Sequence, residues 1–543
     1  MSNQMVEEDC KINSQTIPFK KTGYFSKIIC DYLDRNEKIT PLYNNFPDLA
    51  GFKKQINEKK LSGRAQSRPI LVEVLQQQYK NTNASHKTQQ NIQSLLKEST
   101  FTITTGHQLN LFTGPLYFLY KIISTINLTK QLKSEFPSNN FVPVYWMATE
   151  DHDFEEINYF NFNGKKISWN RESSGGVGRL STEGLKEVLA VFTEELGASK
   201  NARYLKNLFK EAYLQHPNLT DATRFLANKL FGEYGLVIID GDDAALKKQF
   251  IPFVEAELLK QSSCNAVVET IHDLGKEYKV QVNPREINLF YLTDELRERI
   301  ILEEGIYKVN STNISWTKEK ILKHLSEMPE RFSPNVIMRP LYQEVILPNL
   351  CYIGGGGELA YWFELKHYFE TVEVPFPILL LRNSALITSD KQRKKMQKLN
   401  ISTEEIFLKQ EDLIAKKIKE ISEIEIDFSK QRTFLKKQFA DLEVLATQTD
   451  KSFTGAVKAQ QKKQLNGLDN LEKRLLKAEK RRHNAITERI RLVQDELFPK
   501  QSLEERQRNF SELYLEYGEQ LIPKIIEGLE PLKLEFSIIN FIT

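Results

Sequence analysis

Residues 101–117 read Phe-Thr-Ile-Thr-Thr-Gly106-His107-Gln108-Leu-Asn110-Leu-Phe-Thr-Gly114-Pro-Leu-Tyr, followed by an apolar stretch that runs to Leu132. A second unit of the same kind, residues 142–149, ends in Glu150-Asp151-His152-Asp153-Phe-Glu-Glu. Short β-branched and aromatic runs that break into glycine or acidic loops and then enter 3.6-period helices indicate a parallel α/β sheet. Ligands bind beyond the carboxyl ends of the strands in such sheets. We therefore expect both polar clusters to face one cleft.

Further strands are expected along the chain. Residues 235–240 form a short apolar run with an acidic exit, Asp240-Gly-Asp-Asp, and similar runs occur at 350–353 and 377–381. Helical periodicity fills residues 185–234, and residues 280–292 and 306–314 have the composition of a small antiparallel hairpin. The predicted fold class is α/β, with a parallel-sheet core that carries inserted connecting segments.

Composition excludes several classes of protein. The 543 residues are too many for one ordinary core, and 75 basic against 72 acidic residues give a net charge of only +3. No net field favours nucleic acid or a membrane, and no apolar run approaches the roughly 20 residues of a membrane span. The scattered cysteines argue against a disulfide framework, and the polar N-terminus is unlike a signal peptide. These features indicate a soluble, cytoplasmic protein, and the four cysteines are Cys10, Cys30, Cys264 and Cys351.

The amino-acid composition and the hydrophobic periodicity of the chain change near residue 390. We expect residues 1–390 to hold the sheet domain, with an N-terminal helical region and inserts at about 160–234 and 275–330. Beyond them glycine nearly vanishes, and apolar residues recur at 3-4 spacing, as in a coiled-coil seam. Two long antiparallel helices that also mediate dimerisation are predicted, and the alternative is an arm packed on its own core. Residues 391–543 would form this coiled-coil domain, with a tail that returns to the core. The seam residues are Leu468, Leu471, Leu475, Ala478, Ala485, Ile490, Val493 and Leu497, opposite Phe428, Leu435, Phe439, Leu442 and Ala446.

The first candidate site is the segment from Thr105 to Gly114. A strand that runs into glycine and then into a helix leaves backbone N–H groups free to receive an anion. His107 could stabilise a developing phosphoryl charge or act as an acid–base group near neutral pH. Backbone amides near Gly106 and Gly114 could hold a negatively charged transition state. The segment is neither a P-loop nor a dinucleotide fingerprint, and a structural strand–helix turn is the alternative.

The second candidate site is the acidic loop. Glu150, Asp151 and Asp153 surround the imidazole of His152, directly after a predicted strand. Such a group could bind a divalent cation that carries a nucleotide, or could hold an amine substrate. No second histidine or cysteine nearby completes a zinc set. The alternative is that the carboxylates only offset the dipole of the following helix.

The third candidate site is the glycine run that precedes Glu358. Four consecutive glycines allow close approach of the backbone to a ligand and can form an anion-binding nest, although a flexible turn has equal weight. Glu358 and Trp362 would flank that pocket. Arg339 and Arg382-Asn383 are possible clamps for carboxylates or phosphates, although single arginines more often make surface ion pairs. The glycines are Gly354, Gly355, Gly356 and Gly357.

These motifs together resemble the bacillithiol-biosynthesis cysteine-adding enzymes. The resembling segments are residues 105–117, 143–158, 288–291, 330–335, 339–344, 353–365 and 503–506, in the order of that family. The resemblance implies a Rossmann-like core with inserts, a C-terminal coiled coil and a homodimer. It also implies the last step of bacillithiol synthesis, in which the carboxyl of L-cysteine is joined to the amine of glucosaminyl malate.

An amide-forming ligase is therefore the predicted function, with activation of the cysteine carboxyl by ATP and Mg²⁺. The resemblance implies kinship with enzymes whose His-x-Gly-His loop binds ATP phosphates, whereas residues 111–115 here keep Gly114 without flanking histidines. Two alternatives stay open: a dimeric scaffold or thiol-metabolite binding protein without turnover, and an ATP-independent cysteinyl transferase. The catalytic candidates are His107, Asp151, His152 and Asp153. The candidates for binding substrate or nucleotide are Thr105, Gly106, Gln108, Asn110, Gly114, Glu150, Arg339, Gly354, Gly355, Gly356, Gly357, Glu358, Trp362, Arg382 and Asn383.

Overall fold

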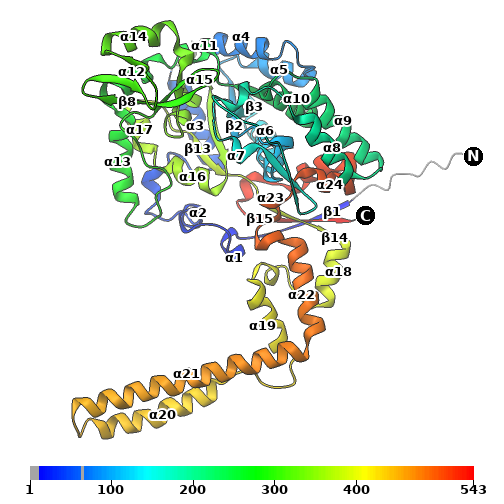
Figure 1. The fold of residues 1–543 in the computed structure, drawn as a ribbon, viewed down its shortest axis with the longest axis vertical. Coiled ribbons are helices and arrows are strands. Elements are labelled where there is room, and N and C mark those ends of the chain that lie inside the picture. The colour runs from blue at the N-terminus through cyan, green and yellow to red at the C-terminus, as the bar shows by residue number, and fades with distance from the viewer. Residues whose placement is uncertain (1–10, 63–66, 543) are drawn as a thin grey trace, which may run out of the picture. The chain divides into compact units, whose positions relative to one another are not determined.

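The computed structural model describes residues 11–62 and 67–542. The chain divides into two compact units (Figure 1). The first unit comprises residues 1–20, 24–387 and 504–543, and the second comprises residues 21–23 and 388–503. Cys10 lies outside the described residues.

A five-stranded, fully parallel sheet forms the centre of the first unit, as the sequence predicts. The chain enters the sheet at β2 in the middle, adds β3 and β6 on one side, and then returns to add β12 and β13 on the other. The strand order therefore reverses between β2 and β12, which is the point where open α/β sheets bind ligands. In order across the sheet, the strands are β13 (Ile378–Leu381), β12 (Asn349–Gly354), β2 (Thr100–His107), β3 (Asn140–Met147) and β6 (Val237–Asp240).

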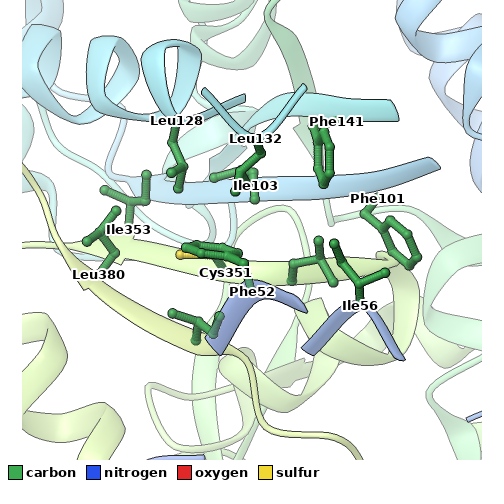
Figure 2. Close-up of a cluster of buried hydrophobic side chains, with 12 residues drawn as sticks. Phe52, Ile56, Phe101, Ile103, Leu128, Leu132, Phe141, Cys351, Ile353 and Leu380 are labelled. Atoms are coloured by element: carbon green, nitrogen blue, oxygen red, sulfur yellow. The ribbon is translucent and has the colours of Figure 1, made fainter. Parts of the chain in front are cut away.

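Helices cover both faces of this sheet. The long helix α6 (Tyr117–Glu135) packs against β2, β3 and β12, while α3 (Leu49–Leu61) packs against β12 and β13. Figure 2 shows Leu128 and Leu132 of α6 on one side of the strands and Phe52 and Ile56 of α3 on the other. Because both faces are covered, these strands are buried along almost their whole length, and all but β2 consist mainly of apolar residues. Cys351 of β12 is fully buried in this cluster, as expected for a small hydrophobe.

The N-terminal region is mostly helical, as predicted, but it begins with a strand that the sequence did not indicate. β1 (Lys11–Ile17) pairs antiparallel with β15 (Phe536–Ile542), and β14 (Ala385–Ser389) completes this second sheet. The sequence of β1 is polar, and its partner strand lies at the far end of the chain, so no local pattern marks it. The helices of this region are α1 (Phe19–Thr22), α2 (Lys27–Leu33), α3, α4 (Arg68–Gln78) and α5 (His86–Ser94).

Two long segments interrupt the parallel sheet. The first follows β3 and holds the hairpin β4–β5 and three helices, as the periodicity of residues 185–234 predicts. Its elements are α7 (Phe154–Ile157), β4 (Tyr159–Phe162), β5 (Lys165–Ser168), α8 (Leu185–Leu196), α9 (Lys200–Leu214) and α10 (Leu219–Phe231).

The second segment follows β6 and contains an antiparallel sheet of five strands. The hairpin expected between residues 280–292 and 306–314 is wrong, because β8 lies between β7 and β9 and pairs with both. The sequence did not indicate β8 because four of its seven residues are charged, which does not fit the pattern of a buried strand. The elements are α11 (Ala244–Lys248), α12 (Ile251–Lys260), α13 (Ser262–Leu274), β7 (Leu289–Leu292), β8 (Arg297–Glu303), β9 (Ile306–Val309), β10 (Ser315–Trp316), α14 (Lys318–Glu327) and β11 (Phe332–Pro334).

The remaining elements of the first unit flank β12 and close the chain. Arg339 lies in the first turn of a helix, α15, and not at a strand end. Two short helices, α16 and α17, follow β12. The elements are α15 (Met338–Ile346), α16 (Gly356–Phe363), α17 (Lys366–Thr371), α23 (Glu504–Gln507), α24 (Phe510–Tyr517) and α25 (Leu521–Gly528).

The second unit is helical, and α20 and α21 lie side by side as the predicted antiparallel pair (Figure 1). The buried apolar cluster between these two helices consists of Phe439, Ala446 and Val457, with Leu435 beside them. The predicted seam is only partly buried, because Leu471 is 53% exposed. The helices are α18 (Asp390–Lys398), α19 (Gln410–Ile421), α20 (Ser429–Ala446), α21 (Lys451–Arg482) and α22 (Asn484–Leu497). No helix among the described residues combines the length and apolarity needed to cross a bilayer.

Candidate active site

A cleft of about 800 Å³ lies at the carboxyl edge of the parallel sheet. The ends of β2, β3 and β12 supply one wall, and the antiparallel sheet supplies residues of β7, β8 and β11. The three polar clusters that the sequence indicated all contribute to it, since each follows a strand of the same parallel sheet. The predicted residues that line the cleft are Gly106, His107, Gln108, Glu150, Asp151, Arg339, Gly355, Gly356, Gly357, Glu358 and Arg382.

Lys121, which the sequence analysis did not select, joins two of these clusters. Its ammonium donates to the Gly106 carbonyl at 2.7 Å and pairs with the Glu358 carboxylate at 2.7 Å. Burial lowers the pKa of Lys121, against the opposing effect of Glu358. Because Lys121 lies one turn into α6, the helix itself aims the ammonium at the end of β2. The sequence signal that could have identified Lys121 is that it is a charged residue within an otherwise apolar helical stretch.

Glu358 is fully engaged by the protein. Besides Lys121, its carboxylate accepts hydrogen bonds from the Tyr352 hydroxyl at 2.8 Å and from the Gly355 amide at 2.8 Å. Burial alone would raise the pKa of Glu358, but Lys121 and the hydrogen bonds hold it below its usual value. Glu358 therefore fixes the glycine loop and leaves little of its carboxylate for a ligand.

The glycines have different reasons for lacking a side chain. A Cβ on Gly354 would lie 2.9 Å from the Tyr352 ring, so packing requires that glycine. A Cβ on Gly355 would meet only Glu358 and Arg382, at 3.4 and 3.7 Å, and one on Gly357 would meet nothing within 4 Å. The loop thus presents open backbone to the cleft at Gly355 and Gly357.

His107 is buried beside Tyr117 and Phe118. Burial, together with the charges of Lys121 and Arg382, holds the pKa of its imidazole well below the usual value. The lowered pKa makes His107 a weak base, and its acid–base role near neutral pH stays a prediction. Its Nε2 has no hydrogen-bond partner.

The two predicted arginine clamps, Arg339 and Arg382, differ in whether the guanidinium already has a carboxylate partner within the protein. Arg339 makes two long hydrogen bonds of 3.3 Å, to Gln343 and to the Tyr361 hydroxyl, and no carboxylate of the described chain lies within ion-pair distance of it. Arg382 is buried and pairs with Glu505 at 2.7 Å. Arg339 is thus available to an anion, whereas the charge of Arg382 is already neutralised.

The acidic loop does not converge on one point. Glu150 forms an ion pair with Lys247, and burial raises the pKa of its carboxyl. Asp151 accepts a hydrogen bond from Gln108 at 3.0 Å. Burial acts to raise the pKa of Asp151, but the hydrogen bond from Gln108 and the charge of Arg297 keep it below its usual value. Two carboxylates of this loop therefore line the cleft: that of Glu150, which is paired with Lys247, and that of Asp151, whose pKa is lowered.

The other members of the acidic loop lie outside the cleft lining. His152 is 49% exposed and accepts a hydrogen bond from Arg297 at 2.7 Å through Nδ1, while Asp153 is exposed. The predicted group of carboxylates around one imidazole is not formed: Asp151 lies 3.8 Å from Nδ1 of His152, whereas Glu150 pairs with Lys247. Among residues 11–62 and 67–542, no group of three or more His, Cys, Asp or Glu is arranged to hold a metal ion.

Arginines form part of the opposite wall. Arg297 and Arg299 project from the same face of β8, and Phe290 is paired with Arg299 across the ladder. The Arg297 guanidinium stacks 4.2 Å from the Phe290 ring. Arg285 lies just before this sheet and also lines the cleft. Sequence reasoning missed this wall because β8 was not recognised as a strand.

Six predicted residues have structural roles instead. Thr105 donates to the Ile353 carbonyl at 2.8 Å, and Asn110 donates to the Glu156 carbonyl. Trp362 is fully buried against Tyr352. The placements of Trp362 and Asn383 in the cleft are therefore wrong, because both are buried away from it. Asn383 bridges Ser124 and Glu530, Gly114 turns the chain at φ 61°, and Gly354 packs on Tyr352.

The charge balance of the cleft differs sharply from that of the chain. Its lining includes three acidic side chains, Glu150, Asp151 and Glu358, and these face seven basic ones. A cleft with such a surplus and low-dielectric walls attracts anions. The basic residues are Lys121, Arg285, Arg297, Arg299, Arg339, Arg382 and Arg506.

Comparison with known proteins agrees with the resemblance noted in the sequence. Residues 12–383 match the family described as "Bacillithiol biosynthesis BshC, N-terminal Rossmann-like domain", and residues 385–541 match its C-terminal coiled-coil domain. The chain therefore belongs to the bacillithiol biosynthesis BshC family, with a Rossmann-like core and a coiled-coil domain.

Close relatives match along nearly the whole chain. A protein of Flavobacterium johnsoniae named "Putative cysteine ligase BshC" is 62% identical over 524 residues, which cover 96% of this chain and 99% of that protein. Proteins with the same name from Christiangramia forsetii and Cytophaga hutchinsonii are 58% and 40% identical, and cover 97% and 95% of this chain and 98% and 97% of their own lengths.

Proposed function

We propose that this chain is a ligase that forms the amide bond between the carboxyl of L-cysteine and the amine of glucosaminyl malate, giving bacillithiol. Family membership and the name of its relatives support this assignment. The observation that carries it for this chain is the cationic cleft at the strand-order reversal, with seven basic against three acidic side chains.

The charges of the proposed substrates suit this cleft. Glucosaminyl malate carries two carboxylates and an amine, and cysteine carries one of each. Arg339, which has no counter-charge of its own, would bind a malate carboxylate with charge-assisted hydrogen bonds. Asp151, whose low pKa keeps it ionised, would hold an ammonium group at the end of β3.

Activation of the cysteine carboxyl is a further part of the proposal. A carboxylate is a poor electrophile, and ATP would supply the leaving group that an attacking amine displaces. Arg285, Arg297 and Arg299 on the second wall would bind the phosphates. The cleft carboxylates are already paired with Lys247, Gln108 and Lys121, so Mg²⁺ would be held mainly by the phosphates, as is usual for this ion.

The test is a direct assay of the purified full-length chain. Incubation with cysteine, glucosaminyl malate and ATP should give bacillithiol together with AMP or ADP, measured by mass spectrometry. Arg339→Gln should raise KM for glucosaminyl malate, and Arg203→Gln, an exposed arginine outside the cleft lining, should not. Product without nucleotide cleavage would favour an ATP-independent transferase. Ligand binding without product would favour a binding protein.

The same proposal includes a homodimer formed through the helical unit. Several apolar side chains of α20 and α21 are exposed in the single chain, among them Phe434 at 65% and Leu471 at 53%. Such a surface is typical of an interface. Replacing Leu471 and Leu475 with glutamate should give monomers in light scattering, and an unchanged dimer would contradict this surface. The other exposed residues are Leu442, Val444, Leu445 and Phe453.

A further inference from the structure

The segment Glu504-Glu505-Arg506 has no role in the function described so far. The chain re-enters the first unit at Glu504, after the 116 residues of the helical unit. Both glutamates are buried, whereas Arg506 is exposed and lines the cleft. A buried carboxylate pair followed by an exposed arginine is an arrangement that needs an explanation, because buried charges are expensive unless they are paired.

Glu505 fixes this segment to the end of β13. Its carboxylate accepts from the Arg382 guanidinium at 2.7 Å, from the Ser384 hydroxyl at 3.2 Å and from the Ala385 amide at 3.3 Å. Arg382 in turn donates to the Asn383 carbonyl at 2.9 Å. The guanidinium lies 5.0 Å from the Tyr117 ring, on the cleft lining. Glu505 thus holds both Arg382 and its own segment against this wall.

Glu504 anchors the same turn. Its carboxylate accepts from the Ile387 amide at 2.5 Å and pairs with Arg508 at 3.1 Å. Arg506 and Gln507 lie between these anchors and Arg508. The two preceding carboxylates are held by Arg382 and by the Ile387 amide of β14, and the exposed Arg506 lines the cleft.

Arg506 supplies a charge that Arg382 does not. Because Glu505 neutralises Arg382, the Tyr117 end of the cleft would otherwise present only Lys121, itself paired with Glu358. No carboxylate of the described chain lies within ion-pair distance of Arg506. Arg506 lines the same cleft as Tyr117 and Lys121. Arg339 and Arg506 are thus two available cations on the wall formed by Gly106, Lys121 and Tyr117.

We propose that Arg506 is a substrate-binding residue that takes one carboxylate of a dicarboxylate substrate, Arg339 taking the other, and that Glu505 is the positioning residue that holds Arg506 and Arg382 in place. This inference rests on the proposed function for the identity of the dicarboxylate, glucosaminyl malate. It assigns part of the substrate site to residues that follow the helical unit in the sequence.

The test is calorimetric titration of the full-length chain with glucosaminyl malate and, separately, with ATP. Arg506→Gln should raise Kd for glucosaminyl malate about tenfold, the loss of one charge-assisted hydrogen bond, with Kd for ATP and the melting temperature unchanged. Arg506→Lys should recover part of the loss. Arg203→Gln is the matched control and should bind as the wild type does. Normal binding of glucosaminyl malate by Arg506→Gln, or a loss confined to ATP, would overturn the assignment.

Glu505 is tested by the split between KM and kcat. Glu505→Asp, which keeps the charge, should raise KM for glucosaminyl malate severalfold with kcat nearly unchanged, and Glu505→Gln should raise it further. If Glu505→Gln does not fold, the Asp variant alone decides, and an unchanged KM there refutes the positioning role. A chain that makes no bacillithiol but binds glucosaminyl malate through Arg506 would refute the ligase and keep this inference. Bacillithiol formation by Arg506→Gln with an unchanged KM for glucosaminyl malate would keep the ligase and refute this inference.

Discussion

The glycine loop 354–358 and the acidic loop 150–153 both follow strands of one parallel sheet, yet the protein uses their charges in opposite ways. Glu358 turns inward and is saturated by Lys121, Tyr352 and the Gly355 amide. The acidic loop instead divides, with Glu150 and Asp151 on the cleft lining and His152 exposed. The single carboxylate of the glycine loop can find enough hydrogen-bond and ion-pair partners nearby. The several charged side chains of the acidic loop cannot all be neutralised by the few partners within reach. The glycine loop is therefore a rigid wall, and the acidic loop is where ionised groups remain accessible.

The largest effect on stability is expected from removing the ion pair between Lys121 and Glu358, which holds the glycine loop. Lys121→Met leaves the Glu358 carboxylate, which is 26% exposed, without its counter-charge and should lower the free energy of unfolding by about 3 kcal/mol. Urea denaturation measures it. The double variant Lys121→Met/Glu358→Gln should recover a large part of the loss, because no unpaired charge is left. A single variant as stable as the wild type would show that the pair does not hold the loop.

The next largest effect is the pH dependence of the free energy of unfolding that His107 causes. The folded-state pKa of His107 is depressed, so below its unfolded value of about 6.5 the unfolded chain binds a proton that the folded chain does not. The free energy of unfolding should therefore fall as the pH drops from 6.5, by up to about 1.4 kcal/mol per unit. Denaturation at pH 7 and 5.5 tests this. His107→Gln should have a shallower slope, and an equal slope would contradict the neutral imidazole.

A smaller effect is expected from the buried member of the acidic loop. Glu150→Gln removes one partner of Lys247, but Asp242 remains 3.3 Å from that ammonium. The free energy of unfolding should fall by about 2 kcal/mol, less than for Lys121→Met. The same denaturation series measures both variants. A larger loss for Glu150→Gln than for Lys121→Met would reverse the comparison between the loops.

Adding bulk to the glycine loop should affect the site more than the fold. A Cβ on Gly355 meets atoms only at 3.4 Å or beyond, and the residue has φ −73°, so Gly355→Ala should change stability by less than about 1 kcal/mol. It should weaken ligand binding, measured by calorimetry, because the methyl group enters the cleft. Gly357→Ala, whose Cβ meets no protein atom within 4 Å, is a second variant that should weaken binding likewise, because Gly357 also lines the cleft. Wild-type binding by both variants would mean that ligands do not approach the loop.

The smallest effect on stability is expected at the exposed end of the acidic loop. His152→Ala should leave the free energy of unfolding within about 0.5 kcal/mol, because the side chain is half exposed. Bacillithiol formation should still fall, since Arg297 loses one of its acceptors on the cleft wall and is held less firmly by those that remain, among them Ser333 and Pro334. Asp151→Asn should lower it as well. Normal turnover in both variants would show that this loop has no part in the reaction.

Local pattern was sufficient for the central sheet and for the position of the cleft. Apolar or β-branched runs that end in glycine or acidic residues marked β2, β3, β6 and β12, because a strand covered on both faces is buried along almost its whole length. Where such strands end in one parallel sheet, their polar exits share an edge, so the three clusters could be placed together before any coordinates were known. The helical period after residue 390 was equally clear.

Other elements gave no local signal. β1 is polar and pairs with the last strand, and β8 carries charged side chains at four of its seven positions. The arginine wall was hidden with β8. Whether a charge in a motif faces a ligand or a protein partner was also undetermined, as the contrast between Arg339 and Arg382 shows.

The sequence by itself thus determined the fold class, the two kinds of domain and the edge of the sheet where the cleft lies. Only the tertiary structure decided which charges are free, because each depends on a partner far away in the chain. Lys121 meets Glu358, and Arg382 meets Glu505. Periodicity and strand exits are properties of neighbouring residues and can be read locally. The neutralisation of a charge is a property of a pair, and the fold alone brings the pair together.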